Sequence, residues 1–250
     1  MKIAVLLTYF NRPILVRGAL ESVRQSNYKN WKLLVGDDNS KIPAEPIARE
    51  VMADCLSQVD FIRSNTTLEE KLSQGTSIGK YANEYLLNSD ADIVVTLCDD
   101  DKLYPDYLHK LADFYEKNQS IMYAYSDISI YNPFNDVQAT LNHKYNQDIG
   151  ADTPAGRLDA SQVTFKADCV RIHGIRFPET TRIGDMPYLN NVDMSFYQQL
   201  YDMFGPITRT GFLGQYKGVH DYQLVWHKKQ GSLGLHRYIK TVQELGGKVF

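Results

Sequence analysis

The feature that most constrains this chain is a short stretch in which an apolar strand runs into three consecutive aspartates. The β-branched, apolar run 93–97 predicts a strand that is buried on both faces. Asp99, Asp100 and Asp101 follow it, and Pro105 then begins a predicted helix. Open α/β sheets bind their ligands at the carboxyl ends of strands, which is where these acids lie.

Two interpretations of the three aspartates are open. Such a run commonly forms a solvated turn that caps the next helix. Alternatively, it holds a divalent cation, because carboxylate oxygens are hard ligands that suit Mg²⁺ or Mn²⁺ better than Zn²⁺. The position of the run directly after a buried strand favours the second interpretation. A metal ion that bridges the protein and a diphosphate is therefore expected here.

Composition excludes several classes of protein. A net charge of −3 and a pI near 6.1 lack the basic excess of nonspecific nucleic-acid binders. The amino terminus is apolar over 3–7 only, which is too short for a signal peptide, and no apolar run reaches the roughly 20 residues of a membrane span. Cysteines 55, 98 and 169 are odd in number and widely spaced, which predicts reduced thiols. A soluble, cytoplasmic protein is expected.

The first half of the chain alternates predicted strands with predicted helices. Apolar segments at 3–7, 33–35, 59–62 and 93–97 have the length of strands, and segments of helical periodicity separate them. This order predicts an α/β protein with a doubly wound sheet. The chain has neither a Gly-x-Gly-x-x-Gly fingerprint nor a Gly-x-x-x-x-Gly-Lys loop to bind phosphate. We therefore expect a metal ion to neutralise the phosphate charge.

Three motifs occur in one order along the first 118 residues. They are Thr8-Tyr9-Phe10-Asn11-Arg12, Val35-Gly36-Asp37-Asp38-Asn39-Ser40, and Asp99-Asp100-Asp101 followed by Leu103-Tyr104-Pro105-Asp106. Together they resemble the family 2 glycosyltransferases of GT-A fold, most closely the small spore-coat polysaccharide type. The resemblance implies a GT-A-like, doubly wound mixed sheet in one domain. A nucleotide-sugar-binding half, 1–118, would be fused to an acceptor-binding half, 119–250.

The resemblance implies roles for the residues that follow the first two strands. Thr8, Phe10, Asn11 and Arg12 would border the nucleotide, and Asp38 would accept a hydrogen bond from the imide N–H of its base. From its residue type alone, Asp38 is equally explained as a turn former, because Asp-Asp-Asn-Ser is a common turn composition. Both interpretations stay open.

The acidic run would bind both nucleotide and metal. Asp99 and Asp100 are the candidates for the ribose, and the metal ligands would be Asp99 and Asp101. Cys98 stands where many relatives carry the first acid of an Asp-x-Asp motif, so the sequence leaves open which aspartate takes the ribose. Lys80 lies near a basic residue that binds diphosphate in some relatives, although an exposed helix lysine is the simpler account.

The second half offers a candidate base. Residues 132–160 carry turn signals and are expected to form a variable acceptor loop. Asp193 begins a predicted helix, where capping alone explains a carboxylate. In the related enzymes a carboxylate at the start of this helix is the catalytic base, usually preceded by another acid, whereas Val192 stands there in this chain. Asp185 is the rival candidate.

The segment from Tyr216 onward is basic in an otherwise acidic protein. A solvated face accounts for such a charge run. The alternative is that it folds over the diphosphate, with His220 resembling a late histidine of the family that binds metal or phosphate.

These features predict an inverting glycosyltransferase that uses Mn²⁺ or Mg²⁺. It would move a sugar from a nucleoside-diphosphate donor, UDP or dTDP being favoured, to a hydroxyl of a saccharide or another acceptor. The alternatives are a sugar nucleotidyltransferase, which would ordinarily show a glycine-rich triphosphate loop, and a glycosyltransferase-like binding or assembly protein that has lost turnover. No membrane span and no nucleic-acid partner are expected.

Overall fold

A computed structural model describes residues 1–67, 78–132, 138–139, 147–179 and 192–218. The first half alternates strands and helices as predicted. Its elements are β1 (Ile3–Tyr9), α1 (Leu15–Arg24), β2 (Trp31–Asp37), α2 (Ala44–Val51), the 3₁₀ helix η1 (Ala53–Gln58), β3 (Val59–Arg63), α4 (Ile78–Asn88) and β4 (Ile93–Cys98). These four strands are parallel in the order β3-β2-β1-β4, which confirms the predicted doubly wound arrangement.

The second half extends the same sheet with strands of mixed direction. Its elements are β5 (Lys102–Leu103), α5 (Tyr107–Lys117), β6 (Tyr123–Tyr131), β7 (Gln138–Ala139), the 3₁₀ helix η3 (Ala160–Gln162), β8 (Val163–Lys166), α6 (Asp168–Arg171), α7 (Val192–Phe204) and β9 (Thr208–Gly218). The order continues from β4 through β8, β6 and β9 to β5, with β7 beside β6. Since β4 pairs with β8, one sheet joins the two predicted halves.

Strands β5 and β9 were absent from the sequence-based prediction. The helix expected from Pro105 begins at Tyr107 as α5, because β5 precedes it and pairs with β9. The sequence 208–218 shows no apolar alternation, so β9 was missed and Tyr216 was placed in a basic tail. In the structure Tyr216 and Lys217 belong to β9, which runs parallel to β6. Residues 219–250 lie outside the described part of the chain.

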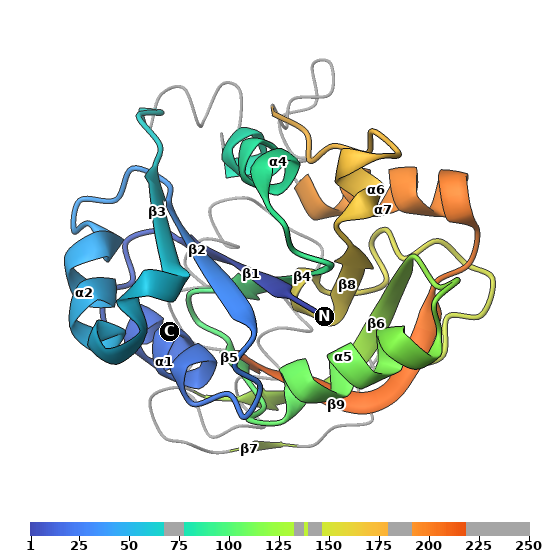
Figure 1. Cartoon of the computed structure of the whole chain (residues 1–250), viewed down its shortest axis with the longest axis horizontal. Coiled ribbons are helices and arrows are strands. Elements are labelled where there is room, and N and C mark those ends of the chain that lie inside the picture. The colour runs from blue at the N-terminus through green and yellow to red at the C-terminus, as the bar shows by residue number, and fades with distance from the viewer. Residues whose placement is uncertain (68–77, 133–137, 140–146, 180–191, 219–250) are drawn as a thin grey trace, which may run out of the picture.

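Strand alternation divides the core between the two faces of the sheet. Ile3, Val5 and Leu7 of β1 pack toward α1, α2 and α5, whereas Ala4 and Leu6 pack toward α4, α6 and α7. Figure 1 shows these two helical layers on opposite sides of the curled sheet. Two covered faces explain why the central strands are apolar along their whole length.

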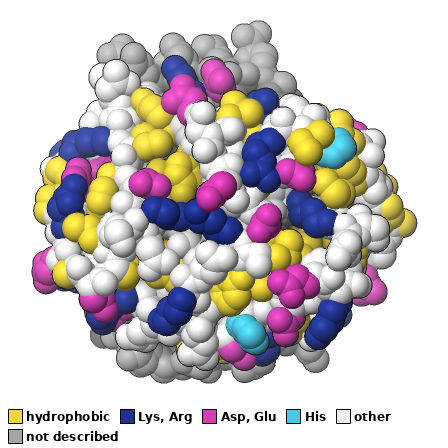
Figure 2. All heavy atoms as spheres, in the orientation of Figure 1, with side chains coloured by type: hydrophobic (Ala, Val, Ile, Leu, Met, Phe, Trp, Pro, Cys, Tyr) yellow, Lys and Arg dark blue, Asp and Glu magenta, His cyan; other side chains and the backbone are white. Residues whose placement is uncertain are grey.

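The surface in Figure 2 carries basic and acidic side chains that are interspersed over the visible face. This mixture matches the small net charge of the chain and gives that face no single-sign electrostatic field of the kind that attracts nucleic acid. Among the helices that the structure describes, none combines the length and apolar character needed to span a membrane.

An aromatic cluster anchors α7 against the sheet. Phe196 is fully buried, stacks on Phe177 with ring centroids 3.9 Å apart, and lies 4.8 Å from the ring of Phe165 in β8. Because the predicted base, Asp193, lies in the first turn of α7, this cluster also determines where that carboxylate lies.

We expect Phe196→Ala to lower the free energy of unfolding by about 3–5 kcal/mol, since it removes buried ring contacts and leaves a cavity. Urea denaturation measures the change. Met203→Ala on the same helix is the control, because Met203 is 50% exposed and its truncation should stay within about 0.5 kcal/mol. Equal losses in the two variants would contradict the anchoring role.

Candidate functional site

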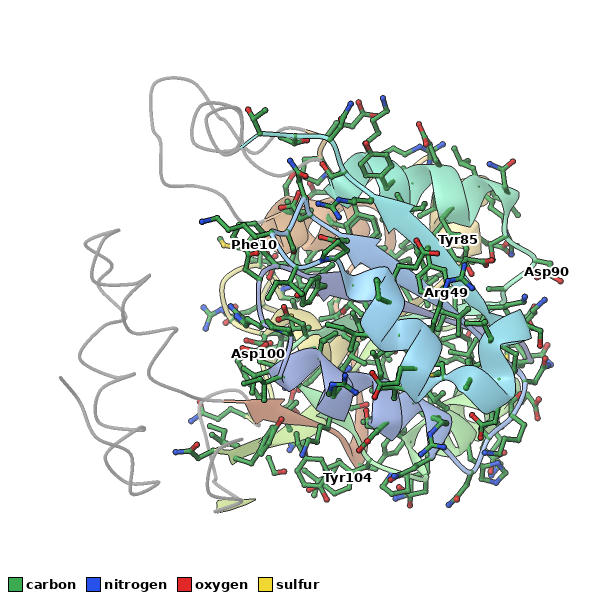
Figure 3. All side chains as sticks on the ribbon, turned by 90° about the vertical axis from the view of Figure 1, so that its left-hand side faces the viewer. Phe10, Arg49, Tyr85, Asp90, Asp100 and Tyr104 are labelled. Carbon is green, nitrogen blue, oxygen red and sulfur yellow. The ribbon has the colours of Figure 1, made fainter. Side chains whose placement is uncertain are left out.

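A cavity of about 460 Å³ opens at the carboxyl ends of β1 and β4. Figure 3 places Phe10 and Asp100 at this edge of the molecule and Asp90, which precedes β4, at the opposite edge. Most of the residues predicted from sequence line the cavity, namely Thr8, Phe10, Arg12, Asp38, Asp99, Asp100 and Asp193. Thr96, Cys98, Tyr197 and Lys217 add further polar groups to its wall. The fold therefore brings the two halves of the predicted site together.

Arg12 ties the loop after β1 to the acidic run. Its Nη1 lies 2.8 Å from Oδ1 of Asp99 and 2.9 Å from Oδ2 of Asp100. The backbone N–H of Phe10 donates to the other Asp99 oxygen at 2.9 Å. Burial raises the pKa of Asp99 to about 7, although the positive charge of Arg12 opposes that shift. Both oxygens of Asp99 are thus held by the β1 loop.

Asp101 joins the acidic run to the end of β9. The carboxylate is fully buried, and its Oδ1 accepts a hydrogen bond of 2.8 Å from the N–H of Gly218. Its Oδ2 has no hydrogen-bond partner in the described part of the chain. Burial raises the pKa of Asp101 well above its usual range, against the opposing charge of Lys217. A buried carboxylate oxygen of this kind is costly unless a cation or donor satisfies it.

Lys217 forms an ion pair in the cavity wall. Its Nζ lies 2.9 Å from Oδ2 of Asp159, and the two side chains are only 19% and 16% exposed. Oδ1 of Asp159 accepts hydrogen bonds from the N–H and the hydroxyl of Ser161, so the carboxylate is fixed at the start of η3. Burial favours the neutral amine, but Asp101 and Asp159 outweigh it and hold the pKa of Lys217 well above its usual value.

Asp159 was not among the residues predicted from the sequence. It lies within the predicted acceptor loop, and Asp159 together with Gln162 forms a capping box for η3. That pattern is visible in the sequence, but it predicts only a helix start. Its contact with Lys217 joins residues that are far apart in the chain, and only the folded structure shows it.

Asp193 lies in the first turn of α7 and faces the cavity. Burial, followed by the negative charge of Asp159, raises the pKa of Asp193 above its ordinary value. Backbone N–H groups at 193 and 194 and the charge of Lys217 oppose the shift. A carboxylate with a raised pKa is a stronger base than an ordinary aspartate. Asp185, the rival, lies outside the described residues.

Two neighbouring aspartates after β2 differ in position. Asp37 accepts hydrogen bonds from the N–H groups of Ser40 and Ala44 at 2.8 and 3.0 Å, so it stabilises the turn into α2. Asp38 lines the cavity, as its predicted contact with a base requires. That contact stays a prediction.

Asn11 also supports this loop region. It has a left-handed backbone with φ of 55°, which asparagine tolerates better than most residues. Its N–H donates to Ser40 Oγ at 3.0 Å, and its side-chain oxygen accepts from the N–H of Lys41 at 2.7 Å. These contacts tie the loops after β1 and β2 together, and Asn11 is not among the cavity-lining residues.

Asp101, which is fully buried, and Lys80 are not among the cavity-lining residues either. Lys80 is exposed on α4, where Gly79 and Ala82 line the cavity instead. His220 lies outside the described residues, so its predicted contact with metal or phosphate stays a prediction.

One group in the described chain has ligand atoms close enough to hold a metal ion. It consists of Cys98, Asp100 and Asp101, whose ligand atoms all lie within 4.8 Å of one another. Together with the unpaired Oδ2 of Asp101, this donor set fits a divalent cation. The predicted metal ligands were Asp99, Asp101 and His220; Asp99 is not in this group, and His220 lies outside the described residues.

Comparison with known proteins adds an independent line of observation. The family model described as glycosyl transferase family 2 matches residues 4–169 of this chain. Protein CgeD of Bacillus subtilis (strain 168) is 23% identical over 203 residues, which cover 80% of this chain and 46% of that protein. A GalNAc(5)-diNAcBac-PP-undecaprenol beta-1,3-glucosyltransferase of Campylobacter jejuni is 28% identical over 110 residues, which cover 44% of this chain and 33% of that protein. The aligned part spans less than half of each relative.

Solved structures show a similar fold. The crystal structure of S. aureus TarS 1–349 in complex with UDP-GlcNAc matches with a TM-score of 0.65 at 15% identity, covering 87% of this chain and 58% of that one. The mannosyltransferase PcManGT from Pyrobaculum calidifontis, in complex with GDP-Man and Mn²⁺, matches with a TM-score of 0.61 at 14% identity. The match covers 92% of this chain and 60% of that one. At these identities the likeness concerns the fold alone.

Gly218 is needed where β9 meets the acidic run. A Cβ added there would lie 2.0 Å from the carbonyl oxygen of Asp100, which is backbone and has little room to move. We expect Gly218→Ala to displace the run and to lower the free energy of unfolding by about 1–3 kcal/mol, the usual cost of overpacking. Urea denaturation measures this change.

The control for this substitution is Gly18→Ala. Its added Cβ would meet only the far part of the Lys102 side chain, at 2.8 Å, which can move aside. Since Gly18 lies within α1, alanine should be neutral or stabilising there by up to about 1 kcal/mol. A Gly218→Ala protein as stable as the Gly18→Ala protein would show that the close approach of β9 is not required.

Proposed function

The chain belongs to glycosyltransferase family 2 and has the GT-A fold, and on that premise we propose that it transfers a sugar from a nucleoside-diphosphate donor to an acceptor hydroxyl. One observation carries the proposal. A single cavity brings together the buried acidic run, two cations and the separate carboxylate of Asp193. Sugar transfer requires charge compensation at the leaving diphosphate and a base for the incoming hydroxyl, and these groups supply both.

The proposed donor is a UDP-sugar or dTDP-sugar. Asp38 lines the cavity next to the β1 loop, and its carboxylate can accept a hydrogen bond from the imide N–H of uracil or thymine. The TarS complexes with UDP and UDP-GlcNAc support a uridine nucleotide, whereas PcManGT was solved with GDP-Man. The sugar and the acceptor are not specified by these residues.

A divalent ion, Mn²⁺ or Mg²⁺, is part of the proposal. Asp100 and Asp101, with Cys98 beside them, are the described residues that would hold it. The bound ion would supply positive charge that stabilises the departing diphosphate. Asp99 has both oxygens hydrogen-bonded to Arg12 and Phe10, so we assign it to orienting the run. His220 stays a predicted ligand.

Arg12, Lys217 and Asp193 have different roles in the proposed reaction. Arg12 holds Asp99 and Asp100 in place, and Lys217 adds a fixed positive charge to the cavity wall. Asp193 takes the proton of the acceptor hydroxyl. The acceptor oxygen bonds to the anomeric carbon while the bond from that carbon to the diphosphate oxygen breaks. This direct displacement inverts the configuration at that carbon.

We expect Mn²⁺ to tighten UDP binding to the wild-type protein, and Asp100→Asn to remove most of that gain. A charged ligand contact contributes roughly 1.5–3 kcal/mol, so the affinity should fall at least about tenfold. Calorimetry with and without Mn²⁺ measures both effects. Asp106→Asn, just beyond the acidic run at a carboxylate that pairs with Lys110, is the control and should bind like wild type. Equal UDP affinity with and without Mn²⁺ would refute the proposed metal dependence.

We expect Asp193→Asn to slow sugar transfer by about 10²–10⁴, the usual loss when a general base is removed. Asparagine keeps a side-chain oxygen for the helix start, so the melting temperature and the UDP–Mn²⁺ affinity should remain near wild type. The control is Asp202→Asn, at an exposed position of α7. Should Asp185→Asn abolish transfer while Asp193→Asn does not, the base has been assigned to the wrong residue.

The same carboxylate predicts a pH dependence. A base acts only when deprotonated, and burial raises the pKa of Asp193 above its ordinary value. The transfer rate of the wild-type protein should therefore fall as the pH drops through that raised pKa, at a pH above the value of about 4 that is usual for aspartate. The residual transfer rate of the Asp193→Asn protein should not show this fall at low pH.

A further inference from the structure

Cys98 gives the acidic site a kind of ligand that its carboxylates lack. It ends β4, lines the cavity, and brings its Sγ within 4.8 Å of carboxylate oxygens of Asp100 and Asp101. The other cysteines are elsewhere, Cys55 in η1 and Cys169 in α6. A thiolate is a soft ligand, whereas carboxylate oxygens are hard ones.

One buried carboxylate oxygen of this group lacks a hydrogen-bond partner among the described residues. Asp101 is fully buried, and its Oδ2 has no hydrogen-bond partner in the described part of the chain. The ammonium of Lys217 is held by Asp159, and Arg12 is held by Asp99 and Asp100. A divalent ion bound between Cys98, Asp100 and Asp101 would satisfy the Oδ2 of Asp101.

We propose that Cys98, Asp100 and Asp101 form a divalent-metal site with a thiolate ligand, which binds the thiophilic ions Zn²⁺, Co²⁺ and Cd²⁺ more tightly than Mn²⁺ or Mg²⁺. The inference rests on the proposed function insofar as the bound ion is the one that meets the donor diphosphate. On binding, the thiol releases its proton to solvent and Sγ donates a lone pair to the ion.

The geometry needs only a small adjustment to accept such an ion. Zinc lies about 2.3 Å from sulfur and about 2.0–2.2 Å from carboxylate oxygen, so neighbouring ligands of a tetrahedral ion are roughly 3.5 Å apart. The group spans up to 4.8 Å, and side-chain rotation of Cys98 and Asp100 would close the difference of about 1 Å. Asp101 is held by Gly218, so it provides the fixed side of the site.

Cadmium titration of the full chain tests the ligand directly. A thiolate bound to Cd²⁺ gives an ultraviolet charge-transfer band, which carboxylate ligands alone do not. We expect the band in the wild-type protein and in the Cys55→Ser control, and its loss in Cys98→Ser. Zinc affinity should fall in Cys98→Ser by more than the about tenfold that loss of an outer-shell partner costs, while Mn²⁺ affinity changes less. Cys98→Asp should narrow the difference between the Zn²⁺ and Mn²⁺ affinities, because oxygen replaces the soft sulfur ligand.

A second measurement avoids dependence on the folding of the variants. In the wild-type protein Zn²⁺ should protect Cys98 from alkylation, read by peptide mass spectrometry, and leave Cys55 unprotected. A cadmium band that survives in Cys98→Ser, or wild-type protein that binds Cd²⁺ without the band, overturns the inference. UDP calorimetry separates it from the proposed function, because absence of UDP binding would refute the donor assignment while the cadmium band would still establish the thiolate ligand.

Discussion

Arg12 reaches across the turn after β4 and contacts the carboxylates of Asp99 and Asp100 with one guanidinium nitrogen. Without such partners, three adjacent carboxylates could not be buried in their charged form, because desolvation costs several kcal/mol per ion and like charges repel. The third acid, Asp101, depends on the N–H of Gly218 in the same way. Each partner comes from a different segment, so burial of the acidic run requires that the β1 loop and the end of β9 converge on it.

That convergence explains the shape of the cavity. The Gly218 backbone approaches the carbonyl of Asp100 so closely that no side chain fits between them, and the preceding Lys217 is thereby placed in the cavity wall. Lys217 in turn requires an anion, which Asp159 supplies from the start of η3. The aromatic cluster around Phe196 holds α7 against the same sheet and so determines where Asp193 lies. The donor side and the acceptor side of the proposed site are thus coupled through buried charge and through packing.

Much of the fold followed from the sequence because its signals were local. Apolar runs of strand length separated by helical periodicity predicted the four parallel strands, and the first turn of α7 was expected at Asp193. Strand β9 was missed because glycine and polar residues interrupt its pattern, and it forms only where β6 and β5 offer hydrogen-bonding edges. Asn11, whose contact with the nucleotide stays a prediction, also ties two loops together, through a neighbour thirty positions away.

The sequence by itself determined that the polar groups after β1, β2 and β4 meet at the carboxyl edge of the sheet, since strand ends and the residues after them are local features. It could not determine how these groups share their charges. That Asp99 pairs with Arg12 and that Asp159 pairs with Lys217 were decided by the tertiary structure. The physical reason is that pairing energies depend on distance and burial between residues far apart in the chain, and neither quantity exists before the sheet closes around the acidic run.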